Sequence, residues 1–272
     1  MIYKFLLGMA LLCSMAMGVQ EAQAIDLSDF QAVQTMADKG QAEAQFAMGS
    51  AYYQGIGVEQ NFKKAFEWFA KAAENNDSDA QFLLGVMYNE GQGVEQDYKK
   101  AFEMYTKCAE QKNPAGYFGL GCLYFYGHGF AVDYKKAREF YLKAAEQDYA
   151  EAEYNLGLMC EEGMGVEKDI HKAFEWYSKA AAQDDADALF ALGGMYYDGR
   201  GVAQDYKKAV EYYTRSADLD HVTAQYNLGV MYEEGQGARQ DYKAAKEWYG
   251  KACDGGDQNG CDSYAKLNKQ GY

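Results

Sequence analysis

Apolar and polar positions follow a helical period along most of the chain, and the whole pattern repeats every 36 residues. In one copy, Tyr98, Ala101, Phe102, Tyr105 and Ala109 fall at the spacing that places them on one side of a helix. Lysine and glutamate residues fill the opposite side of the same stretch. Each copy therefore predicts an amphipathic helix, and a fixed period of this length is typical of a solenoid of stacked repeats.

Two glycines separated by one residue mark every copy of the pattern. The pair begins at Gly55, Gly91, Gly127, Gly163, Gly199 and Gly235. Glycine readily adopts positive φ angles, so the pair is suited to ending one helix and turning the chain. An aspartate, or an asparagine in the first copy, then stands where an N-cap is needed. Each repeat is therefore predicted to be an αα-hairpin, with helix A before the glycine pair and helix B after it.

The pattern divides the chain into four parts. Residues 1–24 are predicted to be a signal peptide, and residues 25–39 an N-terminal capping helix. Six repeats are expected over residues 40–255, and a C-terminal capping helix with a tail over residues 256–272.

The first segment has the features of a secretory signal. An apolar run extends from Phe5 to Met17, and Ala22-Gln23-Ala24 has the small-x-small pattern of a cleavage site. We expect a mature chain that begins at Ile25 and is periplasmic or secreted. A lipoprotein anchored at Cys13 is an alternative, but Leu12 before it is too bulky for a good lipoprotein signal. No later stretch is expected to span a bilayer.

The formal net charge of −15 narrows the range of partners. Nucleic-acid binding requires basic surface, so the charge argues against nucleic acid and against docking on anionic lipid. A basic protein or peptide, or cations, would fit better, although solubility alone would also explain the charge.

The repeat unit resembles the Sel1-like repeat, a relative of the tetratricopeptide repeat. The matching residues in the second copy are Ala80, Leu84, Gly85, Tyr88, Gly91, Gly93, Val94, Asp97, Lys100, Ala101, Tyr105, Lys107 and Ala109. The resemblance implies an all-α fold, in which antiparallel αα-hairpins stack into a right-handed solenoid with a concave inner surface. The departures are Gly116, Cys160 and Ala238, and none of them threatens this fold.

Five cysteines remain after the signal peptide, and two of them suggest a disulfide. Cys253 and Cys261 lie on either side of a predicted turn between two helices. The spacing also resembles the disulfide within the hairpins of secreted, cysteine-rich Hcp-type repeat proteins. Cys108, Cys122 and Cys160 are interpreted as small buried residues at apolar positions.

The sequence contains no recognisable catalytic constellation. His128, His171 and His221 fall in three different repeats, and no zinc-site spacing or phosphate-binding loop is present. We therefore expect no cofactor and no metal. The alternative is an enzyme, because some Hcp-type relatives are linked with penicillin binding and weak β-lactamase activity; a nitrocefin assay would separate the two. A third possibility, an intracellular adaptor for membrane-protein degradation, is disfavoured by the signal peptide.

The tetratricopeptide-like geometry implied by the resemblance places one side of each helix A on the concave surface. Its central position is Phe46, Phe82, Phe118, Tyr154, Phe190 and Tyr226 in the six copies. Two turns further along, the predicted groove residues are Glu90, Phe125, Tyr126, Glu161, Glu162, Tyr197, Asp198, Glu233 and Glu234. This gives an aromatic floor with an acidic margin, suited to a peptide. The alternative is that the aromatic side chains pack against the next repeat.

The third repeat is the favoured position for a partner. The equivalent positions of the other repeats hold a mixed aromatic and acidic set, whereas the third repeat has Phe125 and Tyr126. Glu90, Glu161 and Glu162 would flank these two rings. The hypothesis is that the two rings anchor an apolar side chain while the acids pair with lysine or arginine. Drift within one repeat, or burial of Phe125, is the alternative. We accordingly expect an exported, monomeric, non-catalytic scaffold that binds a protein or peptide.

Overall fold

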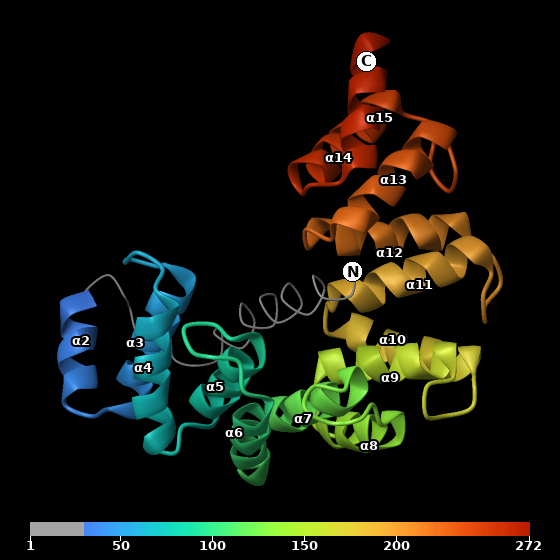
Figure 1. Ribbon diagram of the computed structural model, residues 1–272. Helices are drawn as coiled ribbons and strands as arrows, with labels where there is room; N and C mark the ends of the chain where they lie inside the picture. The colour runs from blue at the N-terminus through green and yellow to red at the C-terminus, as the bar shows by residue number, and fades with distance from the viewer. Residues whose placement is uncertain (1–29) are drawn as a thin grey trace. The chain divides into compact units, whose positions relative to one another are not determined.

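The computed structural model describes residues 30–272, and all regular structure within this range is helical. The predicted signal peptide, its cleavage site and the first residues of the N-terminal capping segment lie outside the described residues. Figure 1 shows successive helices that pair into hairpins. The prediction of an all-α solenoid built from six hairpin repeats is confirmed. None of the helices between residues 30 and 272 is both long and apolar enough to cross a membrane.

The chain divides into two compact units, and the first ends at Gln111. Its helices are α2 (Phe30–Asp38), α3 (Ala42–Gln54), α4 (Phe62–Glu74), α5 (Ser78–Glu90) and α6 (Tyr98–Glu110). Helices α3 and α4 form one hairpin, and α5 and α6 form the next. Helix α2 packs on α3, where Val33 and Ala37 contribute to one apolar cluster with Met48, so α2 covers the end of the array as a cap would.

The second unit runs from Lys112 to Tyr272 and contains four hairpins and a final helix. Its helices are α7 (Pro114–Tyr126), α8 (Tyr134–Ala145), α9 (Ala150–Glu162), α10 (Ile170–Ala182), α11 (Ala186–Asp198), α12 (Tyr206–Asp218), α13 (Val222–Glu234), α14 (Tyr242–Asp254) and α15 (Gln258–Lys269). Helix α15 packs on α14, and Leu267 shares an apolar cluster with Ala245 and Tyr249.

Local capping explains why each helix ends where it does. Gly91 has a φ of 71°, and its N–H donates to the carbonyl of Met87, which ends helix A of the second repeat. Asp97 accepts the backbone N–H groups of Lys99 and Lys100, both at 3.1 Å, and so begins helix B. The second glycine, Gly93, is needed for a different reason. A side chain there would collide with the backbone of Phe62 in the preceding hairpin.

A glycine inside each helix A makes room for an aromatic ring from helix B of the same hairpin. At Gly157, for example, a Cβ atom would lie 2.6 Å from the ring of Tyr177. The glycines are Gly49, Gly85, Gly121, Gly157, Gly193 and Gly229, and the rings above them belong to Phe69, Tyr105, Tyr141, Tyr177, Tyr213 and Tyr249. These rings are buried, so each hairpin has an aromatic centre that fixes the distance between its two helices.

Candidate functional site: the exposed side of the A helices

The six central aromatic residues of the A helices pack against the helix-B rings of their own hairpins. The pairs are Phe46–Phe69, Phe82–Tyr105, Phe118–Tyr141, Tyr154–Tyr177, Phe190–Tyr213 and Tyr226–Tyr249, with ring centroids 5.5 to 5.7 Å apart. Neighbouring repeats also contribute, because Tyr149 packs on Phe118 and His221 stacks on Phe190. The central aromatic residues are therefore structural in every repeat.

These rings differ in how much of them remains on the surface. Phe82 and Phe118 are buried, whereas Phe46, Tyr154, Phe190 and Tyr226 are half-buried and keep an accessible edge. The accessible rings thus lie in helix α3 of the first unit and in helices α9, α11 and α13 of the second.

Residues four apart continue this surface along each helix of the second unit. On α9 the stripe is Tyr154, Leu158 and Glu162, and on α13 it is Tyr226, Val230 and Glu234. On α11 it is Phe190, Gly194 and Asp198, and on α7 it is Phe118, Cys122 and Tyr126. We call these four stripes the A-helix face. All of its residues except Phe118 are half-buried or exposed, and three of the four stripes end in an acid.

The two expected anchors in the third repeat have different surroundings. Phe125 is only 9% exposed, because its ring packs edge-on against Tyr134 at 5.3 Å and also contacts Tyr126 and Tyr141. Tyr126 is half-buried. A ligand on this face can therefore meet Tyr126 but has little access to Phe125. Of the predicted flanking acids, Glu90 is exposed in the first unit.

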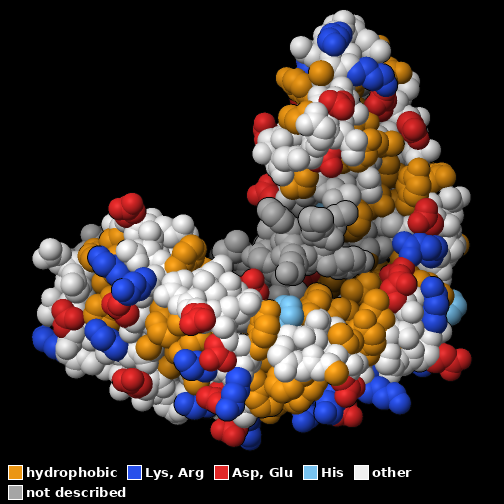
Figure 2. Space-filling model, viewed as in Figure 1, with side chains coloured by type: hydrophobic (Ala, Val, Ile, Leu, Met, Phe, Trp, Pro, Cys, Tyr) orange, Lys and Arg blue, Asp and Glu red, His pale blue; other side chains and the backbone are white. Residues whose placement is uncertain are grey.

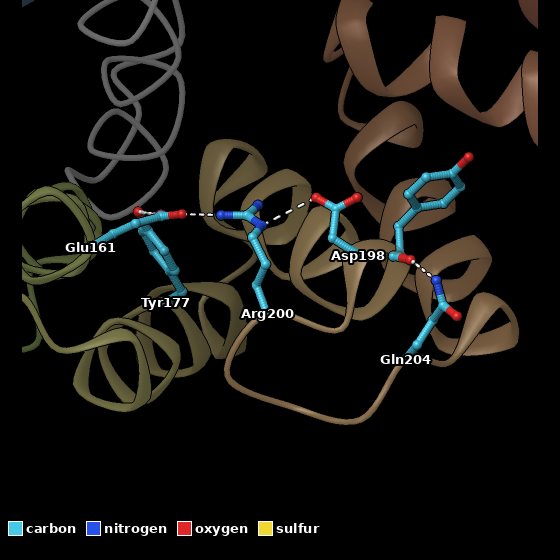
Figure 3. A network of polar contacts seen from close by, with 6 residues as sticks. Glu161, Tyr177, Asp198, Arg200 and Gln204 are labelled. Carbon is cyan, nitrogen blue, oxygen red and sulfur yellow. Dashed lines mark hydrogen bonds and ion pairs between the residues drawn. The ribbon is translucent and has the colours of Figure 1, made fainter.

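Glu161 lies in a network of internal contacts. The Tyr177 hydroxyl donates to Glu161 Oε2 at 2.8 Å, and the Arg200 guanidinium forms an ion pair with Oε1 of the same carboxylate. Figure 3 shows the Arg200 guanidinium between Glu161 and Asp198, whose carboxylate it contacts at 3.1 Å. Burial, and next the Glu161 charge, raise the pKa of the Tyr177 hydroxyl well above its ordinary value.

Glu233 occupies the equivalent position two repeats later and is held in a similar way. The Tyr249 hydroxyl donates to Glu233 Oε2 at 2.8 Å, and Lys266 of helix α15 donates to Oε1 at 2.8 Å. Burial raises the pKa of this carboxyl, but the hydrogen bonds from Lys266 and Tyr249 outweigh it, so the pKa lies below the ordinary value. Glu161 and Glu233 thus have part of their charge compensated within the molecule.

The sequence analysis did not identify the cations that hold these two acids. Arg200 is the middle residue of a Gly-x-Gly pair, and it reaches an acid 39 residues earlier. Gln92 has the same place in its own pair and accepts a hydrogen bond from the Tyr53 hydroxyl, again 39 residues earlier, at 2.6 Å. The recurring separation is a signal that could have indicated this connection between repeats.

The acids of the second unit's A helices, with Glu161 and Glu233 included, are not balanced by basic residues on the same helices. Helices α7, α9, α11 and α13 contain no lysine or arginine, whereas α9, α11 and α13 contain eight acids: Glu151, Glu153, Glu161, Glu162, Asp187, Asp198, Glu233 and Glu234. Every B helix of this unit carries at least two lysines. Charge is therefore segregated between the two kinds of helix. Tyr197, also predicted for the groove, is half-buried and packs edge-on against Tyr206 at 5.2 Å.

Acid groups also gather at the beginning of α11. Asp185 caps this helix by accepting the Ala188 N–H at 2.7 Å. Burial and the nearby charges of Asp187 and Glu151 raise the pKa of Asp185 to about 7, although the hydrogen bond from Ala188 opposes the change. His221 caps α13 through Nδ1, and its Nε2 lies 3.2 Å from Asp187 Oδ1.

Of the other chemical candidates, His171 and the disulfide lie apart from this face, whereas Cys122 is part of it and the His128 ring lies 5.8 Å from that of Tyr126. His171 is exposed on α10 and His128 is half-buried in the loop after α7. Across residues 30–272, no three His, Cys, Asp or Glu residues gather as they would to hold a metal ion. A disulfide joins Cys253 and Cys261 across the turn between α14 and α15, with Cα atoms 4.5 Å apart. Burial raises the pKa of the Cys122 thiol to about 12, which keeps it protonated.

These features define a class of protein: a solenoid of short αα-hairpins in which one kind of helix presents an acidic and aromatic surface. The sequence profile of the Sel1 repeat matches six times, at residues 42–77, 78–113, 114–149, 150–185, 186–221 and 222–257. The chain belongs to the Sel1 repeat family. No relative was found among curated proteins.

Solved structures of similar proteins agree with this assignment. A Sel1 repeat protein from Oxalobacter formigenes is 34% identical, with a TM-score of 0.73 over 79% of this chain and 89% of that protein. A protective antigen present in uropathogenic Escherichia coli strains is 32% identical, with a TM-score of 0.71 over 89% of this chain. The alignment spans 52% of the antigen, about half its length. An immunity protein from Pseudomonas aeruginosa is 25% identical, with a TM-score of 0.59 over 79% of this chain and 81% of that protein.

Proposed function

We propose that the protein is an exported, non-catalytic scaffold that binds a basic segment of another protein on its A-helix face. Sel1 repeats typically mediate protein–protein interactions, and the chain contains six of them. The observation that carries the proposal is the segregation of charge. Helices α9, α11 and α13 carry eight acids, of which Glu153 is buried, and no base, and each has an exposed acid two turns along the helix from its half-buried aromatic residue.

The exposed acids Glu162 and Glu234 are the groups that would meet lysine or arginine side chains of the partner. Glu161, Asp198 and Glu233 contribute less, because Arg200 already contacts the first two and Lys266 contacts the third. The accessible edges of Tyr154, Phe190 and Tyr226 would contact the partner's apolar side chains. Electrostatic complementarity of this kind mainly raises the association rate and specificity, so binding should weaken with added salt.

The proposal is tested with a designed peptide of alternating Arg and Leu and with the same peptide carrying Glu in place of Arg. The purified protein should bind the basic peptide in low salt, and the acidic peptide should not compete with it for the A-helix face. Glu162→Lys with Glu234→Lys should weaken binding about tenfold or more, since both changes place a cation against the peptide.

A matched control makes the same change in net charge on the B helices. Glu175→Lys with Glu247→Lys alters two exposed acids of helices α10 and α14, and it should leave most of the affinity intact. Equal losses from both double variants would show that only net charge matters and would contradict a site on the A-helix face.

Export is the second part of the proposal and rests on the N-terminal sequence. Protein recovered from the periplasmic fraction should begin at Ile25, after the Ala22-Gln23-Ala24 cleavage motif. Retention of Met1, or a lipid-modified N-terminus at Cys13, would overturn this localisation.

A further inference from the structure

The loop between α7 and α8 exposes an unusual amount of apolar surface. Phe130, Val132 and Tyr134 are 39%, 51% and 37% exposed, and they fall within five consecutive residues. The described part of the chain has only four other exposed large hydrophobic residues, Ile56, Leu219, Tyr264 and Tyr272, and they are scattered. Figure 2 shows hydrophobic side chains gathered on the visible surface over α7 and α8, with basic side chains beside them.

This loop lacks a hydrogen bond that forms in four other repeats. Gln60, Gln96, Gln204 and Gln240 occupy the position of Val132, and each donates its side-chain N–H to a carbonyl near the end of helix A, at 2.7 to 2.8 Å. Val132 cannot donate, so the third repeat gives up this contact. The position of Phe130 is a half-buried valine or alanine in the other five repeats. Both differences expose apolar atoms, and the change at the position of Val132 also removes a hydrogen bond from the loop.

The exposed ring continues into a row of stacked aromatic side chains. Phe130 stacks on Tyr124 with ring centroids 5.2 Å apart, and Tyr124 stacks on Phe140 at 5.8 Å. Basic groups border the row, because Lys136 Nζ lies 5.0 Å from the centroid of Tyr124 and Lys143 Nζ lies 5.4 Å from that of Phe140. Lys136 is also 3.9 Å from the capping carboxylate of Asp133, so part of its charge is compensated.

Helix α8 is the most basic helix of the second unit. It carries four basic residues and one acid, whereas in α10, α12 and α14 basic residues exceed acids by only one. A cationic rim around apolar and aromatic side chains complements a segment with the opposite charge and an apolar anchor. This combination is the reverse of the A-helix face, which is acidic.

We propose that Phe130, Val132, Tyr134 and the adjoining basic side of α8 form a second interaction surface, which binds an acidic segment with an apolar side chain on another protein. The apolar anchor would contact Phe130 and Val132, and carboxylates of the segment would pair with Lys136 and Lys143. This surface does not depend on the A-helix face, and its probe has the opposite charge, so either proposal can fail alone.

The test uses a designed peptide of alternating Glu and Leu, and the same peptide with Lys in place of Glu, both titrated into the full chain. The protein should bind the acidic peptide through this surface. Phe130→Val with Val132→Gln restores the residues that the second repeat has at Val94 and Gln96, so the variant should fold and regain the hydrogen bond of the loop. We expect it to weaken binding about tenfold or more while its melting temperature stays the same or rises.

Two further variants locate the effect. Ile56→Gln removes a 50% exposed apolar side chain from the equivalent region of the first repeat and should leave the affinity unchanged. Lys136→Gln with Lys143→Gln should reduce both the affinity and its dependence on salt. Undiminished binding of the acidic peptide by the Phe130→Val, Val132→Gln variant would overturn the proposal, as would failure of the native chain to bind it. Self-association of the native chain that this variant abolishes would also overturn it, since a second copy would then be the occupant.

Discussion

Single glycine residues of the A helices determine how closely the two helices of a hairpin can approach. Gly193 and Gly194 are neighbours in α11 but have different surroundings. A Cβ atom on Gly193 would lie 2.5 Å from the Tyr213 ring, whereas one on Gly194 would meet nothing closer than 3.4 Å, at the end of the flexible Arg200 side chain.

Gly193→Ala should therefore lower the free energy of unfolding by about 1–3 kcal/mol, because Tyr213 must move out of a close-packed position. Gly194→Ala is the matched control. It should be neutral or raise stability by up to about 1 kcal/mol, since alanine favours the helix more than glycine does. Chemical denaturation of both variants measures the difference, and equal effects would contradict the packing described for Tyr213.

The raised pKa of Asp185 predicts an unusual dependence of stability on pH. The folded protein holds the Asp185 proton up to about pH 7, whereas an unfolded aspartate has a pKa of about 3.9. This group therefore stabilises the fold fully below about pH 4, and the contribution is lost as pH rises through about 7. Asp185→Asn keeps a good N-cap residue without the charge, so its melting temperature should exceed that of the native chain at pH 8 and approach it towards pH 4.

Asp169 provides a control with the opposite sign. It caps α10, and hydrogen bonds from the backbone and side chain of Lys172 hold the pKa of Asp169 below its ordinary value. Its contribution is therefore present at neutral pH and is lost as pH falls below the ordinary range of an aspartate. Asp169→Asn should lower the melting temperature at pH 7 and have less effect at low pH. The same pH trend in both asparagine variants would contradict the assignment of Asp185.

Individual site residues were only partly predictable, because their surroundings come from distant parts of the chain. Glu161 reads as a surface acid in the sequence, yet its cation is Arg200, 39 residues away. Phe125 reads as an exposed anchor, yet Tyr134 and Tyr141 of helix α8 cover it. Glu162 is exposed, as the repeat pattern predicts, because its surroundings do not depend on a residue from a distant part of the chain.

At the scale of elements, the helices were predictable because their signals are local. The Gly-x-Gly pair and the following aspartate end one helix and begin the next within a few residues. The same signals recur at the same spacing in all six repeats, so they are easily distinguished from glycine and aspartate residues that occur by chance. The packing of α15 on α14 is different, because it depends on tertiary contacts. Leu267 of α15 shares one apolar cluster with Tyr249 of α14.

The disulfide between α14 and α15 is expected to act on the last hairpin. Closing a loop with a sequence separation of eight residues stabilises it by roughly 2–3 kcal/mol in the chain-entropy model. In a solenoid, stability is approximately a sum of terms from single repeats and their neighbours. Cys253→Ser should therefore increase amide hydrogen exchange in α14 and α15 and leave α9 to α12 protected. Exchange that rises evenly over the second unit would contradict this local effect, and free thiols at both positions in protein isolated from the periplasmic fraction would contradict the bond itself.

At the scale of the whole molecule, the repeated hairpin separates two surfaces of opposite character within the second unit. The A helices of this unit bear acids and accessible aromatic edges, and its B helices bear the lysines. Such a separation is not required for folding, because each hairpin is held together by its buried ring and its caps. The proposed binding of a basic partner to the A-helix face would explain the separation.

Mapping the contact of a basic peptide by methyl NMR tests this central claim most directly. Leu158 of α9 and Val230 of α13 lie between the aromatic residue and the acid of their stripes, whereas Val210 lies in the B helix α12. Titration with the peptide of alternating Arg and Leu should shift the methyl signals of Leu158 and Val230 and leave those of Val210 in place. Shifts at Val210 without shifts at Leu158 and Val230 would contradict the assignment of the A-helix face as the binding surface.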